Sequence, residues 1–167
     1  MIIPFRAMFL AVLACCVGVL GFGLYLQHGL HLEPCPLCIL QRMAFLAIGL
    51  TALLAFLLNP GIVGRMFFGL LIALFSAVGA AVAGRNIWLQ HLPPDKVPEC
   101  GPGLDYLMDT FPLIKALPMV LQGSGECAKV AWTMLGLSIP AWALGWFLVF
   151  LMAGVAALFL RERVKGR

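Results

Sequence analysis

The chain has 167 residues, of which 63% are hydrophobic and only 11% are charged, and its formal net charge is +4. Soluble domains average about 45–50% apolar and about 25% charged residues, so this composition excludes an ordinary soluble domain and indicates an integral membrane protein. The positive charge does not indicate nucleic-acid binding, because the basic residues lie near the ends of apolar segments and form no continuous basic face.

Four apolar stretches are long enough to cross a bilayer, which takes about 20 mostly apolar residues. They cover residues 7–26, 39–58, 66–89 and 140–160. We therefore expect an all-α membrane protein, a single integral membrane domain (1–167) folded as an antiparallel bundle of four transmembrane helices. The first stretch could instead be a signal peptide, but its apolar run exceeds the usual ~7–15 residues and no convincing cleavage site follows.

Basic residues predict how the chain is oriented in the membrane. Arg6 precedes the first span and Arg65 lies in the turn between the second and third spans. The last span is followed by a basic tail with Arg161, Arg163, Lys165 and Arg167. Positive residues accumulate on the cytoplasmic side, so both termini are expected there, with the tail also contacting anionic lipid. The loops at 27–38 and 90–139 are then on the outer side.

A CxxC motif, Cys35-Pro36-Leu37-Cys38, lies where the first outer loop meets the second span. Such a motif occurs in thiol oxidoreductases, in zinc sites and, when His follows, in haem attachment. Ile39 follows here, which excludes haem. Zinc would need two further ligands, for which the widely spaced Cys100 and Cys127 are candidates, and a static disulfide is another alternative. Disulfides persist in an oxidising outer compartment, and Cys100 and Cys127 lack the second CxxC that most four-cysteine zinc sites show, so we favour the redox interpretation.

The second helix is expected to begin near Cys38, where unsatisfied amides and the helix dipole stabilise a thiolate. Arg42 lies at i+4 from Cys38 and hence on the same helix face. Because an arginine within a span is costly, we expect Arg42 to bind a polar headgroup and support the thiolate, the alternative being an interfacial anchor. His91, just after the third span, is a second candidate donor or a plain surface residue.

The second outer loop carries Cys100 and Cys127, each flanked by glycines. Alone, this pair would be read as a structural disulfide. Beside a redox CxxC, we favour an exchangeable bond. Between the two cysteines, the apolar, proline-broken segment 111–121 is too short to span and is expected to form a short interfacial helix; coil packed over the bundle is the alternative.

The chain resembles the DsbB family of bacterial inner-membrane thiol:quinone oxidoreductases. The resemblance rests on the four spans, on the string Cys-Pro-Leu-Cys-Ile-Leu-Gln-Arg from Cys35 to Arg42, and on the later pair Cys100 and Cys127. The resemblance covers nearly the whole chain. It implies that Cys100 is attacked by a DsbA-like periplasmic thioredoxin-fold oxidase and that Cys127 then attacks Cys35. Cys38 would pass the electrons to ubiquinone or menaquinone, with Arg42 binding a quinone oxygen. No metal site is expected.

Three alternatives remain open. A vitamin K epoxide reductase-like bundle is also a membrane thiol–quinone enzyme, but its quinone-facing CxxC lies near the last helix of the core. A DsbB-like protein could serve one dedicated partner. A non-catalytic membrane scaffold with two structural disulfides would tolerate replacement of Cys38 by serine, whereas a redox enzyme would not.

Overall fold

The structure is a computed structural model that describes residues 5–97, 118, 120–121, 123, 125–130 and 132–159. Four of its helices are long and apolar enough to cross a membrane. They are α1 (Phe5–Gly29), α2 (Pro36–Leu58), α3 (Ile62–Gln90) and α7 (Ile139–Phe159). The expected all-α, four-helix membrane bundle is thereby confirmed.

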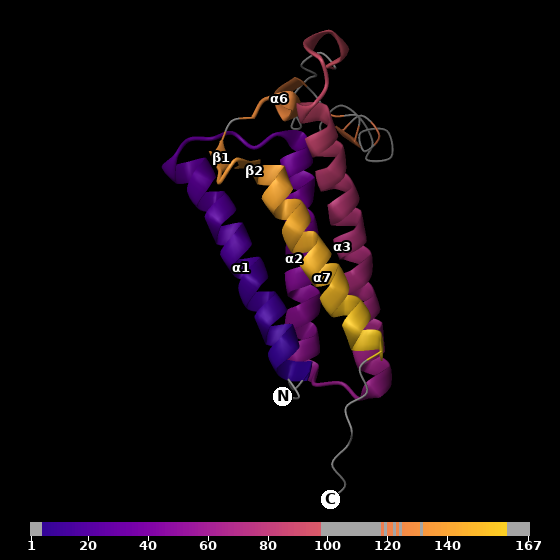
Figure 1. Cartoon of the computed structure of the whole chain (residues 1–167). Helices are drawn as coiled ribbons and strands as arrows, with labels where there is room; N and C mark the ends of the chain where they lie inside the picture. The colour runs from indigo at the N-terminus through magenta and orange to yellow at the C-terminus, as the bar shows by residue number, and fades with distance from the viewer. Residues whose placement is uncertain are drawn as a thin grey trace, which may run out of the picture.

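The four helices run alternately up and down (Figure 1). The start of α1, the connection from α2 to α3 and the end of α7 all lie at one end of the bundle, and the other connections lie at the opposite end. Helix α3 packs against both α2 and α7, and α1 packs against α2, whereas α1 and α7 make few contacts with each other. The bundle is therefore least closed between α1 and α7.

A tight turn at Asn59 makes α2 and α3 antiparallel neighbours. Asn59 adopts a left-handed conformation (φ 41°, ψ 56°) and its N–H donates to the carbonyl of Ala55 at 3.2 Å. Asparagine tolerates this conformation at a helix end better than other residues with a Cβ, and the following Pro60 cannot continue the helix. Helix α3 then starts at Ile62, four residues before the expected start of its apolar span at residue 66.

Aromatic rings fill the centre of the bundle. Phe45 of α2 stacks on Phe147 of α7 with ring centroids 4.1 Å apart, and Phe150 meets Phe45 edge-on at 6.2 Å. Gly79 of α3 lies directly against the Phe147 ring, which leaves no room for a Cβ at that position. Since lipid removes the hydrophobic drive between helices, this close packing is a main source of helix association.

Helices α3 and α7 lie in close contact at Gly154, which gives a first prediction. A Cβ there would lie 2.7 Å from the Gly69 carbonyl oxygen and 2.8 Å from the Ala73 nitrogen, both backbone atoms. We expect Gly154→Val to lower the free energy of unfolding by about 1–3 kcal/mol, as overpacking does. Gly145→Val is the matched control in the same helix, because nothing lies within 4 Å of its Cβ. Equal melting temperatures of the two variants in detergent would contradict this packing.

A β-hairpin that was not predicted precedes α7. Strand β1 (Thr133–Met134) pairs antiparallel with β2 (Leu137–Ser138). The two residues of its turn, Leu135 and Gly136, have φ angles of 54° and 78°, the left-handed conformations that a type I′ turn requires. Trp142 of α7 donates its indole N–H to the carbonyl of Met134 at 3.1 Å, which anchors the hairpin over the end of the bundle.

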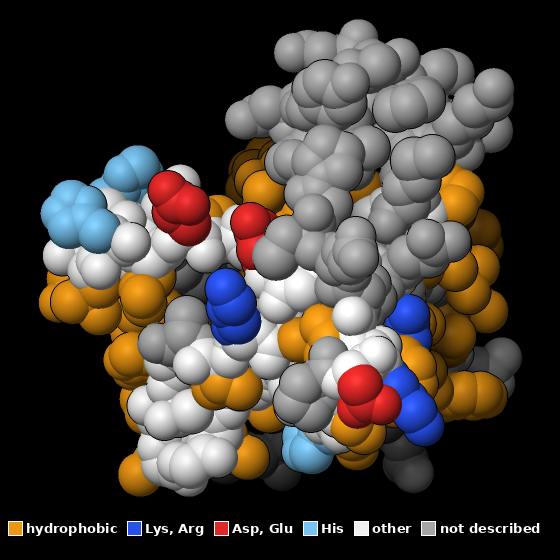
Figure 2. Space-filling model, turned by 90° about the horizontal axis from the view of Figure 1, so that it is seen from above, with side chains coloured by type: hydrophobic (Ala, Val, Ile, Leu, Met, Phe, Trp, Pro, Cys, Tyr) orange, Lys and Arg blue, Asp and Glu red, His pale blue; other side chains and the backbone are white. Residues whose placement is uncertain are grey.

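The remaining described elements lie at the same end as the hairpin. They are the 3-10 helix η1 (Pro94–Lys96) and the short helix α6 (Gly125–Ala128). The segment 111–121 was expected to form an interfacial helix. Within it the structure describes Pro118, Val120 and Leu121, and all three are helical. The rest of the segment lies outside the described residues, as does Cys100. Seen from this end, hydrophobic side chains line the periphery and acidic, basic and histidine side chains lie on the face toward the viewer (Figure 2).

Candidate active site

The CxxC pair forms the start of α2. Cys35 is the N-cap, with extended backbone (φ −66°, ψ 159°), and its sulfur accepts a hydrogen bond from the Cys38 backbone N–H at 3.3 Å. The helix therefore begins at Pro36, two residues earlier than expected, because proline is well suited to the first helical position. The thiol of Cys35 donates to Cys38 Sγ across 2.8 Å, a distance well above the ~2.05 Å of a disulfide.

Cys127 joins this pair from the connection between α3 and α7. Helix α6 places it in a buried cluster with Leu37, Val82 and Leu89, where only 1% of its surface is exposed. Its side chain forms a hydrogen bond with that of Cys35. The sequence suggested an accessible sulfur between flexible glycines, but the apolar side chains of α2 and α3 bury Cys127 instead. Three of the four expected redox cysteines thus lie together, and Cys100 is outside the described residues.

The surroundings of Cys35 favour its protonated form. The hydrogen bond with Cys127 lowers the pKa of Cys35, whereas the hydrogen bond to Cys38, burial and the charge of Cys38 raise it, and the resulting pKa is about 12. Cys35 is therefore a thiol at neutral pH. It acts as a hydrogen-bond donor to Cys38, which is the sulfur better placed to carry negative charge.

Asn86 of α3 is a part of the site that sequence reasoning missed. Its side chain is fully buried, and Nδ2 lies 3.6 Å from Cys35 Sγ and 3.5 Å from Cys38 Sγ. A signal was available in the sequence, because a polar amide near the outer end of an apolar span is costly and so points to a function. Its link to the CxxC pair could not be read from the sequence, since the two are 48 residues or more apart.

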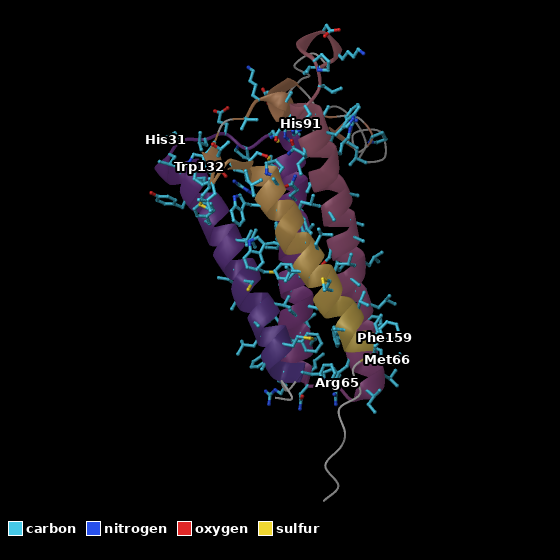
Figure 3. All side chains as sticks on the ribbon, viewed as in Figure 1. His31, Arg65, Met66, His91, Trp132 and Phe159 are labelled. Atoms are coloured by element: carbon cyan, nitrogen blue, oxygen red, sulfur yellow. The ribbon has the colours of Figure 1, made fainter. Side chains whose placement is uncertain are left out.

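A cavity of about 420 Å³ opens beside the cysteines, between α1 and α7 and under the hairpin. Its lining is mostly apolar and includes Cys35, Cys38, Arg42, Asn86 and Cys127. Trp132, which precedes the hairpin, contacts Phe22 of α1 with ring centroids 5.7 Å apart, and both rings line the cavity near the hairpin (Figure 3). Cavities of about 300–1,000 Å³ with few polar groups are typical binding sites for small organic ligands.

Arg42 lies on the wall of this cavity. Its Nη1 donates to Gln27 Oε1 at 2.5 Å and its Nη2 to the carbonyl of Gly23 at 2.9 Å, both on α1. A guanidinium has five N–H donors, so others remain for a ligand. The sequence predicted that Arg42 supports the Cys38 thiolate from the same helix face. Among the described residues, Arg42 makes no hydrogen bond to Cys38, and the amide donor at the Cys38 sulfur is Asn86.

His91 lies apart from the cavity. It is the C-cap of α3, its side chain is exposed, and its Nδ1 is 2.8 Å from the carbonyl of Ile87. The ring lies at the end of the bundle that carries the hairpin (Figure 3). His91 is not among the residues that line the cavity. Its expected role as a second donor stays a prediction.

The fold and the site define a multi-pass membrane protein with clustered thiols beside an apolar cavity. The family model for disulfide bond formation protein DsbB matches residues 5–157. The chain therefore belongs to the DsbB family, and its fold and family identify it as a membrane oxidoreductase of disulfide bond formation.

Individual relatives agree with this assignment. Disulfide bond formation protein B of Aromatoleum aromaticum is 48% identical over 161 residues, which cover 96% of this chain and 95% of the relative. The protein of the same name from Acinetobacter baumannii is 51% identical over 151 residues, covering 90% and 88% of the two chains. A third, from an Azoarcus species, is 48% identical over 162 residues, covering 97% and 93%. The similarity thus extends over nearly the full length of this chain and of each relative.

Proposed function

We propose that this protein is a thiol:quinone oxidoreductase, which reoxidises a DsbA-like periplasmic thioredoxin-fold protein and passes the electrons to ubiquinone or menaquinone. The observation that carries the proposal is the position of Cys38. It touches a second redox-capable thiol on one side and an apolar cavity with a cationic wall on the other. A purely structural disulfide needs no such cavity.

The proposed location is the bacterial inner membrane, with both termini in the cytoplasm and the cysteines in the periplasm. Arg65 lies at the end of the bundle opposite the hairpin and His91 (Figure 3). Arg6 is near that same end, where it stacks on Phe56 at 5.0 Å. The positive-inside rule assigns this end to the cytoplasm, and disulfide exchange suits the oxidising periplasm at the other end.

The residues around the cavity fit a quinone headgroup. The mostly apolar wall would accommodate its ring and the start of its lipid tail, and part of this wall comes from α1 and α7, which make few contacts with each other. Arg42 would donate to a carbonyl oxygen from the N–H groups that α1 leaves available. When bound, a quinone supplies a two-electron, two-proton acceptor.

The proposed electron path runs through four cysteines of the chain. The reduced partner attacks Cys100, and the Cys127 thiol that this releases attacks the Cys35 sulfur of the Cys35–Cys38 disulfide. The hydrogen bond between Cys127 and Cys35 supports attack on that sulfur and not on Cys38. Cys38 is then the leaving group, and the Asn86 amide donates a hydrogen bond to its sulfur. Low basicity of a leaving thiol speeds exchange.

A direct assay tests this function. The purified protein in detergent is supplied with a reduced thioredoxin-fold dithiol oxidase and either ubiquinone or menaquinone, and the loss of quinone absorbance is followed. We expect catalytic turnover with at least one quinone. Absence of turnover with both quinones, while the melting transition shows an intact fold, would contradict the proposal and favour a scaffold with structural disulfides.

A further inference from the structure

Asn86 is the one described side chain whose amide reaches both sulfurs of the CxxC pair. Its Nδ2 lies 3.6 Å from Cys35 Sγ and 3.5 Å from Cys38 Sγ, within the range of hydrogen bonds to sulfur. It comes from α3, whereas both cysteines belong to the start of α2. The contact therefore links the redox pair to a helix that does not carry it.

Keeping an amide at this position costs stability. Asn86 is fully buried, and its Oδ1 has no hydrogen-bond partner among the described residues. An unsatisfied buried acceptor destabilises a fold, whereas an apolar side chain of similar shape would not. Packing alone thus favours leucine over asparagine here, so the amide needs another explanation. Within the part of the chain that the structure describes, its hydrogen-bond partners are the two sulfurs.

We propose that Asn86 is a positioning residue that stabilises the reduced form of the Cys35–Cys38 pair and so makes its disulfide more oxidising. An amide N–H donates more strongly to a thiol or thiolate than to a disulfide sulfur, and most strongly to the charged form. The hydrogen bonds therefore favour the dithiol state. A protein that accepts electrons from a strongly oxidising partner, with a potential of about −120 mV in the DsbA example, needs such a shift.

This inference rests on the proposed function, in which the pair cycles between two states. On closing, Cys35 and Cys38 lose two electrons and two protons and form one S–S bond, and quinone takes up both electrons and both protons. On opening, the S–S bond is broken by electrons from the Cys100–Cys127 pair, which becomes a disulfide in turn. Asn86 gains or loses no proton in either step and acts only on the relative stability of the two states.

The test measures the thiol–disulfide equilibrium of the pair without quinone. The full chain carrying Cys100→Ser and Cys127→Ser is equilibrated in glutathione redox buffers, and the oxidised fraction is read by alkylation and mass spectrometry. We expect Asn86→Leu to shift the equilibrium constant about tenfold toward the disulfide, equivalent to a potential ~30 mV lower. We also expect it to melt no earlier than the parent protein. Asn86→Ala, which adds no volume, repeats the measurement if leucine does not fit.

Ser76→Ala is the matched control. Ser76 also lies on α3, is fully buried and has a hydroxyl with no hydrogen-bond partner among the described residues, which include both cysteines of the pair. Its replacement should leave the redox equilibrium unchanged. An equilibrium constant of the Asn86 variants within about twofold of the parent value would overturn the inference. Because no quinone is present, this result is independent of whether the protein reduces quinone.

Discussion

Replacing Cys38 by serine is expected to lower the rate of quinone reduction by on the order of 10³-fold or more, as removal of a reacting nucleophile does. The hydroxyl of serine cannot form a disulfide with Cys35, so the chain loses the pair whose closure delivers the electrons. Serine is close to cysteine in size, and Cys38 is only half-buried, so the bundle should remain folded. The measurement is the steady-state rate with the reduced thioredoxin-fold partner, alongside the melting temperature.

The same variant should accumulate a trapped species. Without Cys38 as a competing thiol, Cys35 is left next to Cys127, with which it already shares a hydrogen bond. The Cys35 thiol can attack Cys127 of the Cys100–Cys127 disulfide and release the Cys100 thiol, so we expect a Cys35–Cys127 disulfide, detectable by mass spectrometry of the digested protein. Cys16→Ala is the control, because Cys16 is buried within α1 and packs against Gly49, outside the cavity lining. Turnover that survives Cys38→Ser would mean that electrons leave through another group.

The sequence was sufficient to predict the elements whose signals are local. Twenty-residue apolar runs define membrane helices by length alone, and the predicted spans lie within a few residues of α1, α2, α3 and α7. The position of Cys38 in the first turn of a helix followed from the prolines around Cys35. In each case the physical cause lies within a few residues of its effect.

Features that depend on packing between distant segments could not be predicted. The sequence indicated small residues on the third span, but only the structure separates Gly79, which faces Phe147, from Gly84, which has open space around it. It gave no indication of the hairpin that covers the cavity, since Leu135 is not a residue expected at positive φ. The burial of Cys127 likewise depends on apolar side chains from two other helices.

The partners of Arg42 are another such feature, and they lead to the second large expected effect. The sequence predicted that Arg42 lies on the same helix face as Cys38. In the structure, its guanidinium donates hydrogen bonds to the Gln27 side chain and to the Gly23 carbonyl, both on α1. These contacts hold a flexible side chain against the cavity wall. They reduce the entropy that would otherwise be lost when the guanidinium binds a headgroup oxygen.

Replacing Arg42 by methionine is expected to raise the KM for quinone by about 10- to 100-fold, the equivalent of one hydrogen bond to a charged group. Methionine keeps the apolar stem of the side chain but removes its two hydrogen bonds to α1, so we expect a small fall in the melting temperature as well. Alkylation of Cys38 should proceed as in the parent protein, because the donors at its sulfur are Cys35 and Asn86. Quinone titrations at saturating reduced partner protein provide the measurement.

Gln27→Leu separates the charge of Arg42 from its placement. The guanidinium remains in this variant but loses one of its two contacts on α1, so the KM for quinone should rise less than in Arg42→Met, by a few-fold at most. His28→Ala is the control, because His28 is the next residue of α1 and its side chain is exposed. An unchanged KM in Arg42→Met would show that the cationic wall of the cavity does not bind the quinone. The same KM in Arg42→Met and Gln27→Leu would show instead that placement contributes as much as charge.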